Sequence, residues 1–431
     1  METLLLKHNQ TLEKSFLKKA DEYTHVLRKV SESADYSASE SSINAPFDLA
    51  NKEIIDDLVA EFSSSLKYIF VIGIGGSNLG TLAIYQALRG GFDYLLPETS
   101  PKMIFLDTLD PVAIASVHQI ISAFVTKASE VAVCIITKSG TTTETVVNFE
   151  VLYSFLYDSF GDDILHQIVA ITDNGSALQK SAKKKGFHIL EIPKNVGGRY
   201  SVFTSVGIFP LKLAGVNTTE LLKGASSMRN LCLSESFDEN IALSSACLTM
   251  SALEKSQKIA NHFFFHPSLE GVGKWWRQLV AESLGKQVDI SGSTVHAGFT
   301  PVVSIGTTDL HSQAQLYLAG PDDKFTQFIS CAHQAEVQVP EPIVLDDMSN
   351  NFVNKKITDI VSAILSGTKK AYDEHDRKYS EIILPKISEF FLGEYLQFCM
   401  METMYIGYLM GVNAFDQPNV ESYKKYARES M

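Results

Sequence analysis

Two loops rich in glycine and hydroxyl side chains could hold an anion. The first is VIGIGGSNLG, in which Gly73, Gly75, Gly76 and Ser77 lie between an apolar run and a helix-type pattern. Backbone N–H groups and the positive end of a helix dipole meet at such a turn, so it suits a phosphate group. The third glycine of the dinucleotide motif GxGxxG is absent, as is the acidic residue expected about 20 positions later. The loop therefore favours phosphate over NAD, and a tight turn without a ligand is the alternative.

The second loop, KSGTTTET, follows an apolar run that ends at Thr137. Its glycine and hydroxyl residues include Ser139, Gly140, Thr141 and Thr142. Taken alone, this cluster is explained by helix capping, with Glu144 nearby. However, both loops follow strands at the carboxyl edge of one predicted sheet, where open α/β sheets bind their ligands. We therefore predict a second anion site here.

Arg199 and Glu282 are candidates for charge stabilisation and proton transfer. Arg199 follows two glycines at 197–198, which would let the chain bend and hold the guanidinium against an oxyanion. Gln278 and Glu282 are four residues apart and so share one face of a helix. A carboxylate at a helix C-terminus is opposed by the dipole, which suits a general base. Ordinary surface side chains are the alternative at both charged positions.

His311 and Lys424 are candidates for further proton transfer. His311 lies in the first turn of a helix that begins at Asp309, where an imidazole could exchange protons near neutral pH. Lys424 lies in the last helix, near enough to the chain end to reach back over a pocket, and an exposed helical lysine is the alternative. None of the eleven histidines has HExxH or another metal-ligand spacing, so neither a metal nor another cofactor is expected.

The elements that must position these residues alternate between apolar runs and helix-type patterns, as is typical of parallel strands joined by helices. Strands are predicted at 68–74, 103–107, 131–137, 168–172 and 187–190, with helices at 79–89, 111–124, 142–157 and 177–184. Further strands are predicted at 259–265, 302–305, 325–331 and 381–384, with helices at 241–256, 269–282, 309–319, 358–373, 389–410 and 420–429. Because the strands are uniformly apolar, both faces of each sheet should be covered. We predict an N-terminal helical arm over 1–45, a first α/β domain over 46–215 and a second, with the C-terminal helix, over 216–431.

Composition narrows the class of protein. The chain has 431 residues, enough for two or three domains with a sizeable core. With 37 basic and 50 acidic side chains, the net charge of −13 disfavours nucleic acid and anionic membranes as partners. Polar residues such as Glu394 interrupt the apolar segment 390–410, which predicts a buried or interface helix and not a membrane span. Five cysteines without a CxxC pair indicate a reduced, cytoplasmic compartment.

Six segments together resemble the phosphoglucose isomerase family, in the family's order. They are VIGIGGSNLG, KSGTTTET, VGGRYSVFTSVG, WWRQLVAESLGK, TTDLHSQAQ and FDQPNVESYKK. The resemblance implies two sugar-isomerase (SIS) α/β/α domains with mainly parallel sheets, an N-terminal helical arm and a C-terminal helix, in a homodimer. It also implies a cytoplasmic aldose–ketose isomerase of glycolysis and gluconeogenesis, which interconverts D-glucose 6-phosphate and D-fructose 6-phosphate without a cofactor.

The same resemblance implies a role for each candidate residue. Those that would hold the sugar phosphate are Gly76, Ser77, Ser139, Gly140, Thr141 and Thr142. Glu282 would move a proton between C1 and C2 through a cis-enediol, and Arg199 would stabilise the enediolate charge. Lys424 would share in ring opening with His311, which in this family reaches in from the neighbouring subunit. The side chains that would hold the sugar hydroxyls are Gln278 and Gln417.

Three positions depart from the family pattern, namely Lys194, Leu284 and Asn419. Asn419 stands where the family has glycine, and because asparagine tolerates the left-handed conformation, we expect the turn to survive. Lys194 changes the local charge near Arg199 but removes no catalytic group.

Three other functions remain open at this point. The first is an isomerase for mannose 6-phosphate, or one with dual specificity. The second is a non-catalytic sugar-phosphate sensor, which the presence of Glu282, His311 and Lys424 disfavours. The third is an NAD-dependent oxidoreductase, which the incomplete dinucleotide motif disfavours.

Overall fold

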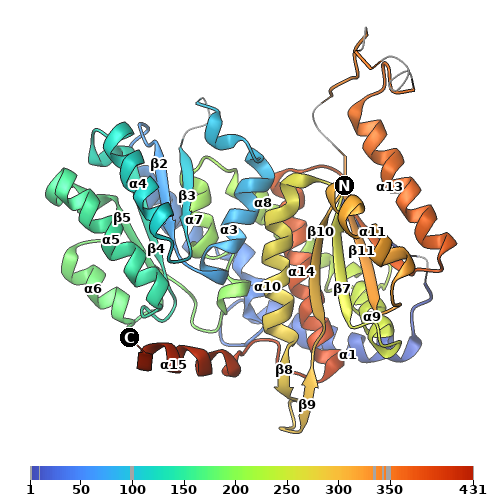
Figure 1. Cartoon of the computed structure of the whole chain (residues 1–431). Coiled ribbons are helices and arrows are strands. Elements are labelled where there is room, and N and C mark those ends of the chain that lie inside the picture. Colours follow the sequence, from blue (N-terminus) through green and yellow to red (C-terminus); the bar gives the residue numbers. More distant parts are fainter. Residues whose placement is uncertain are drawn as a thin grey trace.

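The computed structural model describes residues 2–8, 10–97, 101–332, 336–341, 344–345 and 351–430. Within these ranges the chain forms two five-stranded sheets and a two-stranded hairpin, with helices on both faces of each large sheet (Figure 1). The predicted fold class, α/β with mainly parallel sheets in three-layer α/β/α arrangements, is confirmed. None of the described helices is long and apolar enough to cross a membrane.

The first sheet has the order β3–β2–β4–β5–β6, and all its strands are parallel. Its strands are β2 (Tyr68–Ile72), β3 (Lys102–Leu106), β4 (Val131–Ile136), β5 (Ile168–Thr172) and β6 (His188–Glu191). Its helices are α4 (Pro111–Phe124), α5 (Thr143–Phe160) and α6 (Ala177–Lys185) on one face, and α2 (Leu49–Ala60), α3 (Leu79–Arg89) and α7 (Ser205–Leu213) on the other. Side chains alternate along β2, so Phe70 and Ile72 pack with the first group and Ile69 and Val71 with the second.

The second sheet has the order β1–β12–β11–β7–β10, in which only β1 is antiparallel. Its strands are β1 (Leu5–His8), β7 (Ile259–Phe264), β10 (Thr300–Ile305), β11 (Lys324–Cys331) and β12 (Tyr379–Leu384). Its helices are α9 (Ile241–Glu254), α10 (Glu270–Leu284) and α14 (Glu389–Met410) on one face, and α11 (Thr308–Ala319) and α13 (Ile357–Glu374) on the other. Phe263 and Phe328 pack with α11 and α13, whereas Phe264 packs with α14.

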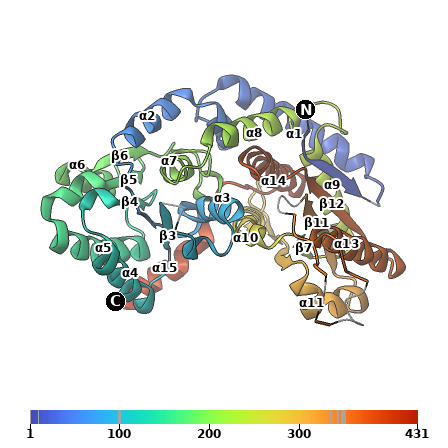
Figure 2. The same ribbon diagram turned by 90° about the horizontal axis from the view of Figure 1, so that it is seen from above.

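The remaining elements connect and cover the two sheets. The helices α1 (Lys14–Ser33) and α8 (Thr218–Leu231) pack on α14, β8 (Lys286–Val288) and β9 (Thr294–Ala297) form the hairpin, and α15 (Glu421–Ser430) follows the last turn. The short 3₁₀ helices are η1 (Ser41–Phe47), η2 (Gly75–Ser77), η3 (Asp93–Leu95), η4 (Ala128–Glu130), η5 (Gly161–Gln167), η6 (Gly198–Tyr200), η7 (Pro267–Leu269) and η8 (Pro418–Val420). Helix α10 contacts both α3 and α14, so it lies between the two sheets (Figure 2).

The N-terminal segment differs from the prediction. The segment expected to be a helical arm contains α1, but it begins with β1, which pairs with β12. The backbone N–H of Leu4 and the hydroxyl of Thr3 donate to the Glu394 carboxylate, at 3.2 and 3.0 Å. A four-residue strand is too short to show a periodicity, and its partner lies far along the sequence. The N-terminal segment is therefore part of the second sheet as well as a helical arm. The division of the chain at residues 45 and 215 remains a prediction.

Candidate active site

Arg199 lies in η6 and is almost completely buried, with 2% of its surface exposed. Its Nε donates to Ser283 Oγ at 2.7 Å, and Nη1 donates to Gln417 Oε1 at 2.8 Å. Nη2 donates to the carbonyls of Ala414 at 2.7 Å and Asp416 at 3.2 Å. Because every nitrogen of the guanidinium has an acceptor, the positive charge is held in one fixed position.

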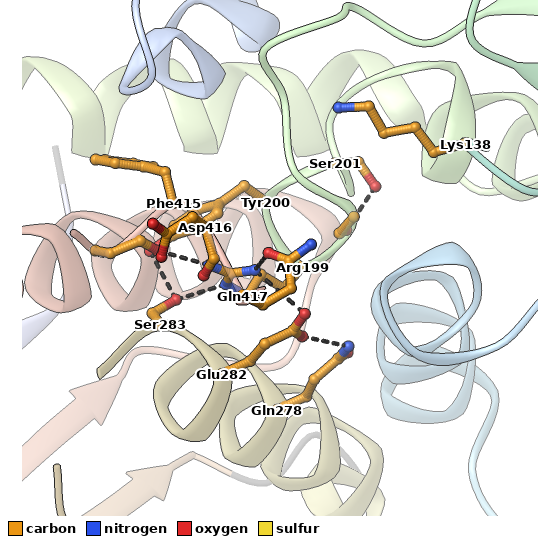
Figure 3. Close-up of polar contacts among 12 residues, drawn as sticks. Lys138, Arg199, Tyr200, Ser201, Gln278, Glu282, Ser283, Phe415, Asp416 and Gln417 are labelled. Atoms are coloured by element: carbon orange, nitrogen blue, oxygen red, sulfur yellow. Dashed lines mark hydrogen bonds and ion pairs between the residues drawn. The ribbon is translucent and has the colours of Figure 1, made fainter. Parts of the chain in front are cut away.

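Glu282 lies beside this fixed charge, in the last turn of α10 (Figure 3). Its Oε1 lies 3.3 Å from Arg199 Nη1, and its Oε2 accepts a hydrogen bond from Gln278 Nε2 at 3.0 Å. The Glu282 side chain is 24% exposed, whereas that of Arg199 is 1% exposed. The carboxylate is therefore oriented by two neighbours and remains open to a ligand. Gln278 Oε1 is buried and has no hydrogen-bond partner among the described residues, so it can accept one from a ligand hydroxyl.

The first glycine-rich loop lies directly against these residues. Gly75 has φ +61°, and a Cβ there would lie 2.7 Å from Gln278 Nε2. A Cβ at Gly76 would lie 2.1 Å from the carbonyl carbon of Gly198, the residue before Arg199. Such close approaches leave room only for glycine. The loop therefore places Ser77 near both the arginine and the base.

The second loop connects β4 to α5, next to the first loop because β2 and β4 are neighbouring strands. Thr142 occupies the N-cap position, but its side chain does not cap the helix and instead contacts the Thr137 hydroxyl at 2.9 Å. Ser139 and Thr141 are exposed, and Ser139 Oγ accepts from the Thr141 hydroxyl at 3.2 Å. Gly140 has φ +74°, and a Cβ there would lie 2.6 Å from Leu178 N. The hydroxyl cluster is therefore not explained by helix capping.

His311 lies far from Glu282 within one chain. Helix α10 follows β7 and runs back along the sheet, so Glu282 lies near the amino ends of β7 and β10 (Figure 1). Helix α11 follows β10, so His311, in its first turn, lies near the carboxyl ends of the same strands. The His311 side chain is exposed. The structure thus separates this histidine from the carboxylate of its own chain.

Lys424 is also separate from the Arg199–Glu282 pair. It lies on α15, which runs along the side of the first sheet in both views (Figures 1 and 2). Its Nζ forms an ion pair with Glu421 of the same helix at 2.8 Å. Among the described residues, no hydrogen bond or ion pair joins it to Arg199 or Glu282. The start of α15 is fixed by a hydrogen bond from Asn419 Nδ2 to Gln287 Oε1, at 3.1 Å.

The structure places all three residues that depart from the family pattern, and it explains the apolar residue at position 284. Asn419 lies in the turn η8 and is not among the residues with positive φ, so the turn does not use the left-handed conformation that asparagine tolerates. Leu284 is buried in the main core, which suits its apolar side chain. The carbonyl of Lys194 accepts a hydrogen bond from Lys138 Nζ at 2.5 Å, and that of Val196 accepts another at 2.9 Å. Burial lowers the pKa of Lys138.

The family follows from comparison with known proteins. Residues 56–430 match the family model of phosphoglucose isomerase. The chain belongs to the phosphoglucose isomerase family. The glucose-6-phosphate isomerase of Carboxydothermus hydrogenoformans is 33% identical over 376 residues, which cover 86% of this chain and 80% of that protein. The enzyme of the same name from Leptospira biflexa is 35% identical over 381 residues, which cover 88% of this chain and 82% of that protein.

Two solved structures share the fold of this chain. A hypothetical protein from Thermus thermophilus has a TM-score of 0.85 and 27% identity, with 99% of each chain covered. A glucose-6-phosphate isomerase from Chlamydia trachomatis has a TM-score of 0.79 and 20% identity, covering 100% of this chain and 88% of that one. At that identity the second likeness shows the fold alone.

Several residues that hold the site together were not predicted from the sequence. They are Lys138, Tyr200, Ser283, Lys286, Ala414 and Asp416. Ser283 and Lys286 lie within four residues of Glu282, so proximity to the proposed base was a usable signal. Ala414 and Asp416 accept through backbone carbonyls, which have no signature in a sequence.

Proposed function

We propose that this chain interconverts D-glucose 6-phosphate and D-fructose 6-phosphate, as an aldose–ketose isomerase of glycolysis and gluconeogenesis. Membership of the phosphoglucose isomerase family and the names of its relatives support this function. The single observation that carries it is the contact between Glu282 and the buried Arg199, at 3.3 Å. An isomerisation through an enediol needs one carboxylate to move a proton and one cation to hold the oxyanion, and it needs no redox or metal cofactor.

In this proposal Glu282 removes a proton from one carbon and returns it to the neighbouring carbon. Removing the proton leaves negative charge on the adjacent oxygen, which the fixed guanidinium of Arg199 stabilises. Gln278 orients the carboxylate through Nε2 and has its Oε1 available for a sugar hydroxyl. Gln417 accepts a hydrogen bond from the same Arg199 nitrogen, Nη1, that faces Glu282. Its side-chain amide is assigned to the sugar hydroxyls.

The phosphate group binds between the two loops at the carboxyl edge of the first sheet. Its proposed contacts are the hydroxyls of Ser77, Ser139, Thr141 and Thr142 and the backbone of Gly76 and Gly140. Close packing supports this assignment, because a glycine lets the backbone at positions 76 and 140 lie directly against neighbouring backbone and leaves no side chain to cover its N–H group. An acidic chain can bind an anion here because helix N-termini and hydroxyls concentrate a favourable field locally.

Ring opening is assigned to Lys424 and to His311 from a second copy of the chain. The position of His311, at the opposite edge of the sheet from Glu282, supports a homodimer in which each subunit supplies this histidine to the other's site. Lys424 would exchange its ion pair with Glu421 for a contact with the sugar.

A cytoplasmic location is supported by five free cysteines, four of them buried.

A coupled assay of the purified full-length chain tests the function, with wild type beside Glu282→Gln. Glutamine keeps the shape of the side chain but cannot accept the proton, so we expect kcat to fall by at least about 10³-fold while the protein stays folded. An inactive wild type, or a glutamine variant that keeps most of its activity, would overturn the proposal. Mannose 6-phosphate in the same assay separates glucose specificity from dual specificity.

A further inference from the structure

Lys286 is a buried lysine that has no role in the scheme above. It begins β8, four residues after Glu282, and 7% of its surface is exposed. Its Nζ donates to the backbone carbonyl of Glu282 at 3.1 Å, to that of Asp416, and to the Asp416 carboxylate at 3.0 Å. An ammonium group has three hydrogens, so these three acceptors satisfy it.

The three acceptors belong to the two segments that carry the proposed catalytic pair. The Glu282 carbonyl is part of the last turn of α10, which presents the base. The Asp416 carbonyl also accepts from Arg199 Nη2, and the next residue, Gln417, accepts from Arg199 Nη1. Lys286 therefore joins the turn that carries the carboxylate to the segment that holds the guanidinium.

The surroundings of Lys286 also bear on the charge of the site. The charged groups that face it are Asp416, Arg199 and Glu282. Burial lowers the pKa of its ammonium, and the hydrogen bond with Asp416 opposes that shift. A positive charge next to Arg199 adds to the field that stabilises an anionic intermediate.

We propose that Lys286 is a positioning residue for the isomerisation. It holds Glu282 and Arg199 at their working separation by fixing the two segments against each other, and it does not touch the substrate. This inference rests on the function proposed above. The sequence signal is a lysine four residues after the base, where it reaches back to the C-terminal turn of the helix.

Steady-state kinetics of Lys286→Met test the proposal, because methionine keeps much of the length and removes all three donors. A displacement of reacting groups by about 1 Å costs on the order of 10²-fold in rate, so we expect kcat to fall about that much and KM to change less than about threefold. The matched control is Lys102→Met. Lys102 is also a buried lysine, 8% exposed, and its Nζ donates to backbone carbonyls of Asp93 and Leu96. It lies at the start of β3, among the amino ends of the strands, whereas the two loops follow the carboxyl ends. The kcat of Lys102→Met should therefore stay within about twofold of wild type.

The ratio of the inhibition constants of two inhibitors provides a measurement that a loss of stability would not change. An aldonic acid phosphate carries a carboxylate where the enediolate charge develops, whereas a hexitol phosphate is neutral there. Lys286→Met should weaken the first about tenfold or more relative to the second, because only the first depends on the aligned positive charges. Equal weakening of both would overturn the proposal, as would a kcat within about twofold of wild type or an equal loss of kcat in Lys102→Met.

Asp416→Asn keeps the proposal testable if Lys286→Met does not fold. Its side chain is half exposed, and asparagine retains the backbone carbonyl while weakening the contact with Lys286. We expect kcat to fall about tenfold with KM nearly unchanged, and an unchanged kcat would overturn the proposal. An inactive wild type would instead refute the proposed function itself.

Discussion

Individual residues in this chain are fixed most firmly where charge must be buried. Arg199 is almost inaccessible to solvent, yet each guanidinium nitrogen donates to an acceptor. Two of the four acceptors are backbone carbonyls. A lysine could not reproduce this, because it lacks the planar fork of donors. Glu402 in α14 is also buried, but its carboxyl has little to stabilise a charge. It accepts a hydrogen bond from Ser245 Oγ at 2.5 Å. Burial raises the pKa of the Glu402 carboxyl to about 7, against which the Ser245 hydrogen bond acts only in part.

The raised pKa of Glu402 makes stability depend on pH. The folded chain keeps a proton that the unfolded chain, with a carboxyl pKa near 4.5, has already released. Stability from this group is therefore complete below about pH 4.5 and is lost as the pH rises through 7, by roughly 3 kcal/mol. We expect the free energy of unfolding of Glu402→Gln, relative to that of wild type, to rise by about that amount from about pH 5 to about pH 8. Urea unfolding of both proteins at the two pH values measures the difference. A difference between variant and wild type that is the same at both would contradict the assignment.

At the residue scale, side-chain chemistry was predictable and mutual placement was not. The motif resemblance assigned roles to Glu282 and Arg199, which are far apart in the sequence but 3.3 Å apart in space. Backbone acceptors at Ala414 and Asp416 could not be predicted, because any residue type can supply a carbonyl. His311 and Lys424 were assigned to the same site, and whether they reach it stays a prediction because neither contacts Glu282 in one chain.

Pairs of elements are held close by glycines at their crossings. The helices α8 and α14 approach so closely that a Cβ at Gly224 would lie 1.8 Å from the carbonyl oxygen of Phe390. A Cβ at Gly393 would lie 2.0 Å from the carbonyl oxygen of Leu221. In both cases the obstacle is backbone, which cannot move aside without separating the helices.

Gly224→Ala should therefore destabilise the protein, even though alanine is the better helix former. We expect the free energy of unfolding to fall by about 3 kcal/mol, because the helices must separate to admit the methyl group. The control is Gly367→Ala in α13, where a Cβ meets no atom within 4 Å and should stabilise by up to about 1 kcal/mol. Chemical denaturation of both variants measures the effect, and equal stability in the two would contradict this account.

At the element scale, long apolar runs were the most predictable features. Helices α3, α4 and α14 have the predicted bounds, and the strands of the first sheet differ by at most two residues at either end. The hairpin β8–β9 was missed because its residues are mostly exposed and its strands, of three and four residues, are too short to show a clear periodicity. Strand β1 was missed because its pairing depends on residues more than 370 positions away.

The arrangement of the whole molecule places the proposed histidine and carboxylate at opposite edges of the second sheet. A homodimer that exchanges His311 predicts that two inactive variants restore each other. In a hybrid of Glu282→Gln with His311→Ala, one of the two sites contains Glu282 from one subunit and His311 from the other. We expect mixing under dissociating conditions to raise activity well above that of either variant alone. Activity that stays at the level of the parents would show that each chain supplies its own histidine, or that the chain works as a monomer.

Pairing of β1 with β12 also sets the order in which the molecule can be completed during synthesis. The five strands of the first sheet leave the ribosome together, over residues 68–191, so that sheet can close on local contacts. Strand β1 is translated before them, but its partner is not available until residues 379–384 have emerged. The nascent chain must therefore carry an unpaired edge through most of translation, a state that invites association with other chains. Its short length and the exposed Lys7 and His8 limit that risk until the sheet is complete.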